Sequence, residues 1–323
     1  MIKFFQNKIL VCQVSLANNI PIIIENYENF SKIYKNVIFF IICPENEINI
    51  FKKKLDKKNI IIINENKLLN FSKLKKFFNQ NFKKIKYKNK INLRLKWYYQ
   101  QFLKISFILN QKITKNTNIL LWDADTLILK KINFTDSKNI AINYANVFEY
   151  HKPYFLTAQK LLKKKIFKYH KSSINQFIYL QSDDVKNLKD FFYYKKKKKD
   201  NNFLLKKIFK SMLDANKKFN HSMFSEYEFI NLMRLSNKNK YHQKIIFFLR
   251  YKLKGRLTNF QKKICILFNC LHVTYEQENS SFKNKLILNN EEKNIDFIII
   301  LFRNYFKYIT RKIKYNLMFF FRG

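Results

Sequence analysis

The sequence has few of the residues that bend or cross-link small proteins, with 2 glycines, 3 prolines and 4 cysteines among 323 residues. The cysteines show neither C-x-x-C spacing nor the density of a disulfide scaffold, so we expect buried free thiols in a reducing compartment. No run of about 18 consecutive apolar residues occurs, so no membrane span is predicted. The glycine-rich dinucleotide fingerprint is also missing, which leaves a nicotinamide or flavin enzyme without support.

The N-terminal residues lack the long apolar core of a signal peptide. They begin with a weakly basic segment, but Gln13 and Ser15 interrupt the apolar part. This pattern fits a first core strand better than a secretion signal. We therefore expect a cytoplasmic protein, which a basic surface could still attach to the inner face of the cell membrane.

Acidic residues are scarce, with 22 Asp and Glu against 64 Lys and Arg, and the formal net charge is +42. Such a charge fits nucleic acid, anionic lipid or another polyanion as partner. The lysines are spread along the whole chain except for the run at 195–199, and solvated lysine faces in a chain shaped by AT-rich codons explain them. No zinc-finger cysteine pairs or RNP-type aromatic strand occur. Nucleic-acid binding is kept as the competing class, and binding that survives physiological salt would favour it.

The first hundred residues alternate between short apolar runs and helical patterns. The apolar runs lie at 9–16, 37–43 and 59–65, and helical patterns occupy 28–35 and 45–58. This alternation predicts parallel strands covered by helices on both faces. The fold class expected is α/β, with a Rossmann-type arrangement at its start.

Residues 94–109 predict a helix with two distinct faces. Core residues are expected at Tyr98, Phe102, Ile105 and Leu109, which share one face. The other face is either a surface edge or a site for a polar ligand, and it carries Trp97, Gln100, Gln101 and Lys104.

An apolar strand at 118–122 ends in the sequence WDADT. In α/β sheets, ligands bind beyond the carboxyl ends of the strands, where Asp123 and Asp125 would lie. Two carboxylates one residue apart suit Mn²⁺ or Mg²⁺, which completes its coordination with water and substrate phosphates. The alternative is a turn in which both side chains cap backbone amides.

Four motifs in a fixed order give the chain a resemblance to a known family. They are Arg94 followed by WYYQQFLK at 97–104, WDADT at 122–126, EYHKPYF at 149–155 and FSEYE at 224–228. Over about residues 9–235 the chain resembles a bacterial family of predicted glycosyltransferases that are associated with surface polysaccharide synthesis. Many of its members are labelled as a domain of unknown function.

The resemblance implies a GT-A-like nucleotide-sugar-binding fold and a hexosyltransferase-like activity. Asp123 and Asp125 would hold Mn²⁺ or Mg²⁺ on the diphosphate of a nucleotide-sugar donor, with Asp125 also counted as catalytic. The acceptor would be a saccharide or a lipid-linked saccharide, and Glu226 would take the proton from its hydroxyl. The residues implied in substrate binding are Arg94, Trp97, Gln100, Gln101, Trp122, His151, Lys152, Tyr154 and Glu228.

Several of these residues have simpler explanations. Glu228 can complete a capping box with Ser225 at the start of a helix, which leaves Glu226 as the better base. His151 can be an ordinary loop histidine, and Lys152 is one lysine among dozens. His272 is a weak candidate for a third metal ligand, because nothing around it selects it.

The chain also departs from the family pattern. Phe177, after Gln176, stands where the family tends to show a histidine, and Lys96 stands where it has a glycine. The missing histidine leaves an acceptor-side contact without a counterpart. A non-catalytic interaction protein built on a transferase fold is therefore a second alternative.

We expect two parts, a GT-A-like domain at 1–235 and a mainly helical basic region at 236–323. Residues 297–323 contain six basic residues and no acidic one. A basic amphipathic helix of this kind either lies on an anionic membrane surface or packs on the core as an ordinary terminal helix. The helical stripe consists of Phe302, Phe306, Ile309, Ile313, Leu317 and Phe320, flanked by Arg303, Lys307, Arg311 and Lys314.

Overall fold

The central feature of the computed structural model is a five-stranded sheet with the order β3-β2-β1-β4-β7. Its strands are β1 (Ile9–Val14), β2 (Val37–Cys43), β3 (Ile60–Asn64), β4 (Asn118–Trp122) and β7 (Phe177–Leu180). The first four run parallel, and β7 pairs antiparallel with β4 at the edge. The predicted α/β class is confirmed. The structure describes residues 8–82, 88–112, 118–146, 149–164, 172–193, 201–216, 222–236, 242–251, 256–275 and 290–320.

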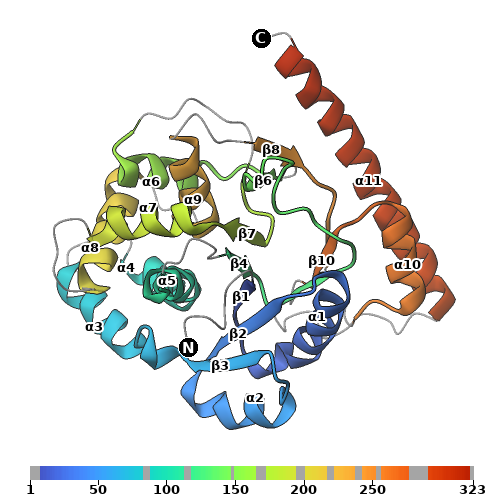
Figure 1. Ribbon diagram of the computed structural model, residues 1–323. Helices are drawn as coiled ribbons and strands as arrows, with labels where there is room; N and C mark the ends of the chain where they lie inside the picture. Colours follow the sequence, from blue (N-terminus) through green and yellow to red (C-terminus); the bar gives the residue numbers. More distant parts are fainter. Residues whose placement is uncertain are drawn as a thin grey trace.

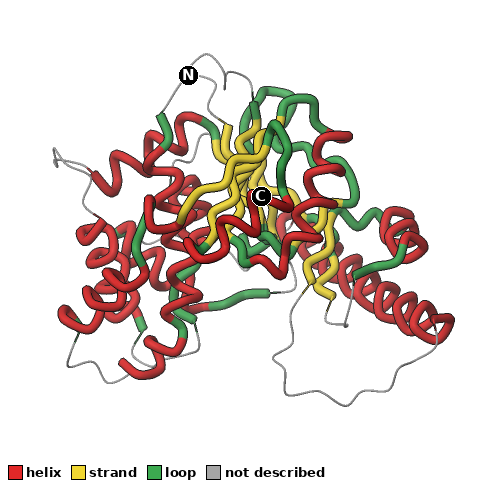
Figure 2. The backbone as a smooth tube through the Cα atoms, turned by 90° about the horizontal axis from the view of Figure 1, so that it is seen from below, coloured by secondary structure: helices red, strands yellow, loops and turns green. Residues whose placement is uncertain are grey.

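Helices cover both faces of this sheet (Figures 1 and 2). Because side chains alternate along a strand, Phe40 and Phe39 of β2 belong to opposite core clusters. All seven positions of β2 are buried, as expected for a parallel strand between two helical layers. One face is covered by α3 (Phe71–Asn81), α5 (Leu95–Asn110), α6 (Lys152–Leu162), α7 (Ser182–Tyr193), α8 (Asn201–Ala215) and α9 (Glu226–Leu235), and the other by α1 (Ile20–Ile33) and α2 (Ile48–Lys54).

Two expected helices have different bounds in the structure. The first was expected at 28–35, but α1 begins at Ile20 and carries a proline in its first turn. Its start, IPIII, is β-branched and apolar, yet Ile20, Ile22 and Ile23 are buried against the sheet. Tertiary packing outweighs their weak helix preference here. The second, α2, is shorter than the helical pattern at 45–58.

Two smaller sheets lie beside the central one. One has the order β5-β10-β9, formed by β5 (Thr126–Ile128), β10 (His272–Tyr275) and β9 (Leu249–Tyr251), and the other pairs β6 (Ile142–Ala145) with β8 (His242–Ile245). Strands on both sides of residue 235 therefore share sheets. The domain boundary expected at 235 stays a prediction, and the region after it contains strands as well as helices.

The remaining helices are α4 (Lys88–Leu93), α10 (Asn259–Leu267) and α11 (Asn290–Phe320). Within the described ranges, no helix is both long and apolar enough to cross a membrane. The lysine run at 195–199 lies outside the described residues.

Candidate active site

A cavity of about 730 Å³ opens beyond the carboxyl end of β4. It lies between the start of α9, one face of α5 and the loop before α6. Nine residues predicted from the sequence to form a site line it together, namely Arg94, Trp97, Gln100, Gln101, Asp123, Asp125, His151, Tyr154 and Glu226. Their roles toward a substrate stay predictions.

A tight turn between β4 and β5 presents the two aspartates. The Asp123 N–H donates to the Gln176 carbonyl at 2.9 Å, and the Thr126 N–H donates back to the Asp123 carbonyl at 3.0 Å. The indole N–H of Trp122 donates to the Thr126 carbonyl at 2.7 Å. The turn is thus fixed by two backbone hydrogen bonds and one from the Trp122 side chain, and Asp123 and Asp125 both line the cavity.

Gln176, whose carbonyl accepts the hydrogen bond from Asp123, itself has an unusual backbone conformation. Its φ of 61° is in the left-handed region, which residues other than glycine seldom adopt. Its side-chain Oε1 is buried without a hydrogen-bond partner among the described residues, and the residue lines the cavity. An unpaired buried acceptor at a cavity wall is costly to the free protein, and a ligand hydroxyl could satisfy it.

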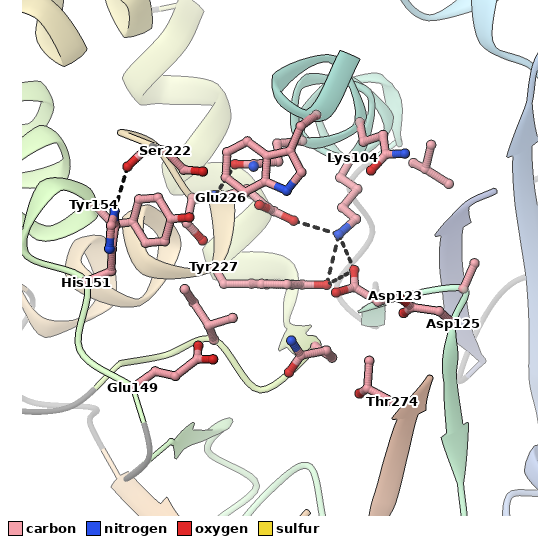
Figure 3. Close-up of a pocket in the computed structure, with 18 of the residues that line it drawn as sticks. Lys104, Asp123, Asp125, Glu149, His151, Tyr154, Ser222, Glu226, Tyr227 and Thr274 are labelled. Carbon is pink, nitrogen blue, oxygen red and sulfur yellow. Dashed lines mark hydrogen bonds and ion pairs between the residues drawn. The ribbon is translucent and has the colours of Figure 1, made fainter. Parts of the chain in front are cut away.

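The charged centre of the cavity is a buried cluster around Lys104 (Figure 3). The Lys104 ammonium donates to Asp123 Oδ1, to Glu226 Oε1 at 2.7 Å and to the Tyr227 hydroxyl at 3.0 Å. Tyr227 in turn donates to Asp123 Oδ1 at 2.6 Å. Residues from α5, from the β4–β5 turn and from α9 are thereby joined at one point.

The charges in this cluster do not balance. Asp123, Asp125 and Glu226 supply three carboxylates, and Lys104 supplies one ammonium. Burial lowers the pKa of Lys104, but the charges of Asp123 and Glu226 outweigh it and hold that pKa well above its ordinary value. Burial, and then the charge of Asp123, raise the pKa of Asp125 to about 7. The site therefore has room for a further positive charge beside Asp125.

Glu226 is more deeply buried than Asp123 and Asp125. It is 2% exposed, and its backbone N–H donates to Gln101 Oε1 at 3.3 Å. Burial raises the pKa of Glu226, and the neighbouring Lys104 charge opposes that shift. A carboxylate whose proton affinity is raised by burial is suited to accept a proton.

The other end of the cavity is aromatic. The rings of Trp97 and Tyr154 are stacked, with centroids 6.1 Å apart and planes at 16°. His151 lies against Tyr154 with ring centroids 4.3 Å apart, and its Nε2 is 2.7 Å from the Ser222 carbonyl oxygen. Arg94 donates to the Ser222 hydroxyl at 2.8 Å. Figure 3 shows Glu226 and Tyr227 between these residues and the aspartates.

Three predicted substrate-binding residues do not line the cavity. Trp122 has no exposed surface and stacks on Phe177 with ring centroids 5.2 Å apart, so it shapes the turn from the core. Lys152 is exposed outside the cavity. Glu228 is buried and accepts from the Ser173 N–H at 2.9 Å, while Ser225 caps its helix.

The structure also bears on the suggested metal-ligand role of His272 and on the histidine that the family pattern has at position 177. His272 is fully buried between the rings of Trp122, Phe177 and Phe248 and does not line the cavity, so a metal-ligand role is not supported. Burial lowers the pKa of His272 to about 3. Phe177 belongs to the same core cluster as Trp122 and Phe248 and does not line the cavity. Having phenylalanine there instead of the histidine of the family pattern therefore removes no contact inside the cavity. The neighbouring Gln176 is the residue that lines the cavity.

Other cavity residues had little or no signal in the sequence. Tyr227 lies between Glu226 and Glu228, and its hydroxyl donates to Asp123 Oδ1. Arg250 and Thr274 come from β9 and β10, which follow the last of the four motifs. Only the pairing of β10 with β5 brings Thr274 next to the aspartates.

We expect Glu228→Gln to stabilise the protein at pH 8 and to leave it unchanged near pH 4. Burial raises the pKa of Glu228 from 4.5 to about 7. Between those values the folded state holds a proton that the unfolded state has released, so the contribution of this group to stability falls as the pH rises. The loss reaches at most about 3 kcal/mol at pH 8. The glutamine oxygen can still accept from Ser173.

Melting temperatures of the wild type and the variant between pH 4 and pH 8 measure this effect. Glu28 provides the matched control, because Glu28→Gln makes the same substitution at an exposed position, and the gain at pH 8 should be larger for Glu228→Gln. Parallel curves for wild type and Glu228→Gln would show that folding does not raise the pKa of Glu228.

The comparisons with known proteins give one family and a number of solved structures of low sequence identity. A family model described as "Family of unknown function (DUF6492)" matches residues 17–254. A solved structure of the galactosyltransferase LgtC with donor and acceptor sugar analogues has 8% sequence identity, covering 89% of this chain and 94% of that one, with a TM-score of 0.41.

Two further structures are similarly distant. An active-site mutant of LgtC has 10% identity, covering 90% of this chain and 95% of that one, with a TM-score of 0.41. The glycosyltransferase GlyE of Streptococcus pneumoniae TIGR4 has 8% identity, covering 95% of this chain and 64% of that one, with a TM-score of 0.32. No curated protein matches the sequence.

Proposed function

The chain belongs to the DUF6492 family, whose function is unknown, and we propose that it is a metal-dependent glycosyltransferase. It would move a sugar from a nucleotide-diphosphate sugar to a saccharide or lipid-linked acceptor, in the synthesis of a surface polysaccharide. The observation that carries the proposal is the turn after β4, which presents Asp123 and Asp125 to a cavity of about 730 Å³. The four ordered sequence motifs support it, because residues from each of them line that same cavity.

The carboxylates fit Mn²⁺ or Mg²⁺. Asp125 and Asp123 offer hard oxygen ligands. Burial, and then the charge of Asp123, raise the pKa of Asp125, so a positive ion beside it would favour the ionised carboxylate. Among the described residues no third His, Cys, Asp or Glu joins them. These ions accept such a set, because water and phosphate oxygens complete their coordination. Bound there, the ion would neutralise the diphosphate that leaves the sugar.

The residues of the chain itself can be assigned to the two substrates. Arg94 and Lys104 supply positive charge along the cavity. The stacked faces of Trp97 and Tyr154 can pack against the apolar face of a sugar ring. Glu226 would accept the proton of the acceptor hydroxyl, whose oxygen forms the new bond to the anomeric carbon as the bond to the diphosphate breaks. The Lys104 ammonium donates to Oε1 of Glu226, so the other carboxylate oxygen, Oε2, would be the one that accepts this proton.

Calorimetric titration with UDP- and GDP-sugars, with and without Mn²⁺ or Mg²⁺, tests this function. We expect one nucleotide sugar to bind, and binding to weaken about tenfold or more without the metal, because an ion held by Asp123 and Asp125 would neutralise charge on the diphosphate. The free sugar without its nucleotide diphosphate is the control and should give no signal. Failure of every donor to bind, or binding that is indifferent to metal, would overturn the proposal.

A further inference from the structure

Most of the large apolar side chains that are exposed in the described part of the chain lie on two neighbouring helices. Scattered apolar residues are normal on protein surfaces, but a concentration of them marks an interaction site. On α10 they are Phe260, Ile266 and Leu267, and on α11 they are Ile295, Ile299, Ile300, Phe302, Phe306 and Ile313. Phe302 packs against Phe268 at the end of α10, with ring centroids 6.0 Å apart, so the two helices meet where these residues lie.

Most of the exposed apolar residues of α11 form one stripe that is separate from the face packed on the protein. Phe297, Leu301 and Tyr308 are buried in the cluster that contains Leu127 and Val273. At 100° per residue this buried face lies well over a quarter-turn from the exposed stripe. The other described residues leave the stripe uncovered, and it consists of Ile295, Ile299, Phe302, Phe306 and Ile313, which are 54–64% exposed.

Basic residues form the adjoining stripe of the same helix. Arg303, Lys307, Arg311 and Lys314 are all exposed, and helical geometry places them next to the apolar stripe. After Asp296 the helix contains no acidic residue. An apolar stripe bordered by basic side chains is the arrangement of helices that lie in the interface of an anionic bilayer.

The position of α11 leaves these stripes accessible. Figure 1 shows α11 along one side of the molecule, with its C-terminal half extending past the other elements. Its buried face packs on Leu127 of β5 and Val273 of β10, and β10 also supplies Thr274 to the cavity. A surface bound through α11 would therefore be connected to the candidate active site through a single small sheet.

We propose that the exposed face of α10 and α11 docks on the surface of an anionic lipid bilayer. An acidic protein would satisfy the basic stripe but gives no reason for large, exposed isoleucine and phenylalanine side chains beside it. A lipid interface accepts both, because apolar side chains enter the acyl boundary while lysine and arginine contact the head groups. This attachment is independent of the proposed transferase activity, and it would bring the enzyme to a lipid-linked acceptor.

Co-sedimentation of the full-length protein with vesicles tests the docking. We expect binding to phosphatidylcholine vesicles containing phosphatidylglycerol, and little binding to phosphatidylcholine alone. Phe302→Ser with Phe306→Ser should reduce binding about tenfold or more, because two exposed aromatic rings no longer enter the bilayer. Point variants are used because truncation would remove the buried Phe297 and Leu301.

Two matched controls separate this surface from the general charge of the protein. Ile50→Ser with Ile61→Ser changes apolar residues that are exposed elsewhere and should leave binding unchanged. Arg303→Gln, Lys307→Gln and Lys314→Gln together should reduce binding more than Lys52→Gln, Lys53→Gln and Lys54→Gln on α2.

A spectroscopic probe reports on the apolar stripe directly. Phe306→Trp should show a blue-shifted emission upon addition of anionic vesicles, whereas the wild type, with Trp97 and Trp122 only, should not. The proposal is overturned if the serine variant binds as the wild type does, or if the two triple variants lose binding equally. The proposal is also overturned if vesicles do not bind and the protein instead binds an acidic protein or polyanion in a way that depends on Phe302 and Phe306.

Discussion

Asp125→Asn should abolish sugar transfer while leaving the protein at least as stable as the wild type. The substitution keeps the shape of the side chain and removes the charge that would bind the metal, so we expect the rate to fall about a hundredfold or more. Burial and the charge of Asp123 already raise the pKa of Asp125 to about 7. The ionised carboxylate therefore costs stability above its ordinary pKa, and that cost increases as the pH rises. Asparagine removes this cost.

Two measurements on the same protein separate a lost metal site from a lost fold. Transfer or donor binding in the presence of Mn²⁺ should fall, and the melting temperature at pH 8 should be equal or higher. The exposed Asp214 offers a control of the same chemistry, since Asp214→Asn should change neither quantity. Normal turnover by Asp125→Asn would remove the metal role, and a lowered melting temperature would show that Asp125 is structurally stabilising.

The framework of this site could be predicted from the sequence because it depends on local patterns. The apolar run at 118–122 is long enough for one buried strand, and it forms β4 with the same bounds. The two-faced pattern at 94–109 forms α5, in which the expected core residues are buried. Once β4 and α5 are placed, the polar face with Trp97, Gln101 and Lys104 and the pair of aspartates meet at one end of the sheet.

The remaining parts depend on contacts between distant residues, which one sequence does not display. The Lys104 ammonium reaches Glu226, which lies over a hundred positions later, and no local pattern pairs those two residues. Trp122 directly precedes the aspartates, but side chains alternate along β4, so its ring lies in the core cluster on the face of the sheet that is covered by α1 and α2. Thr274 enters the cavity only because β10 pairs with β5.

Lys104→Met should change the metal affinity of the protein as well as its activity. The ammonium is bound to Asp123, Glu226 and Tyr227, so it acts as an internal counter-ion for Asp123, which would also receive the divalent ion, and for Glu226. Removing it leaves the buried Glu226 and the partly exposed Asp123 uncompensated, which costs about 3–5 kcal/mol of stability. The same excess charge should tighten the binding of Mn²⁺ by about tenfold or more. Transfer should fall because Asp123 and Glu226 lose their fixed positions.

Melting curves with and without Mn²⁺ measure both effects without depending on catalysis. Mn²⁺ should raise the melting temperature of Lys104→Met more than that of the wild type, since the stabilisation by a ligand increases with the logarithm of its affinity. Lys262, which pairs with Glu25 at a partly exposed site, supplies the control, because Lys262→Met should not alter the response to Mn²⁺. If Lys104→Met does not fold, Lys104→Met with Glu226→Gln removes one of the two uncompensated charges and keeps the Asp123 and Asp125 pair. An equal or smaller response to Mn²⁺ in these variants would mean that Lys104 assists the metal, for example by holding Asp123 toward it, and does not compete with it.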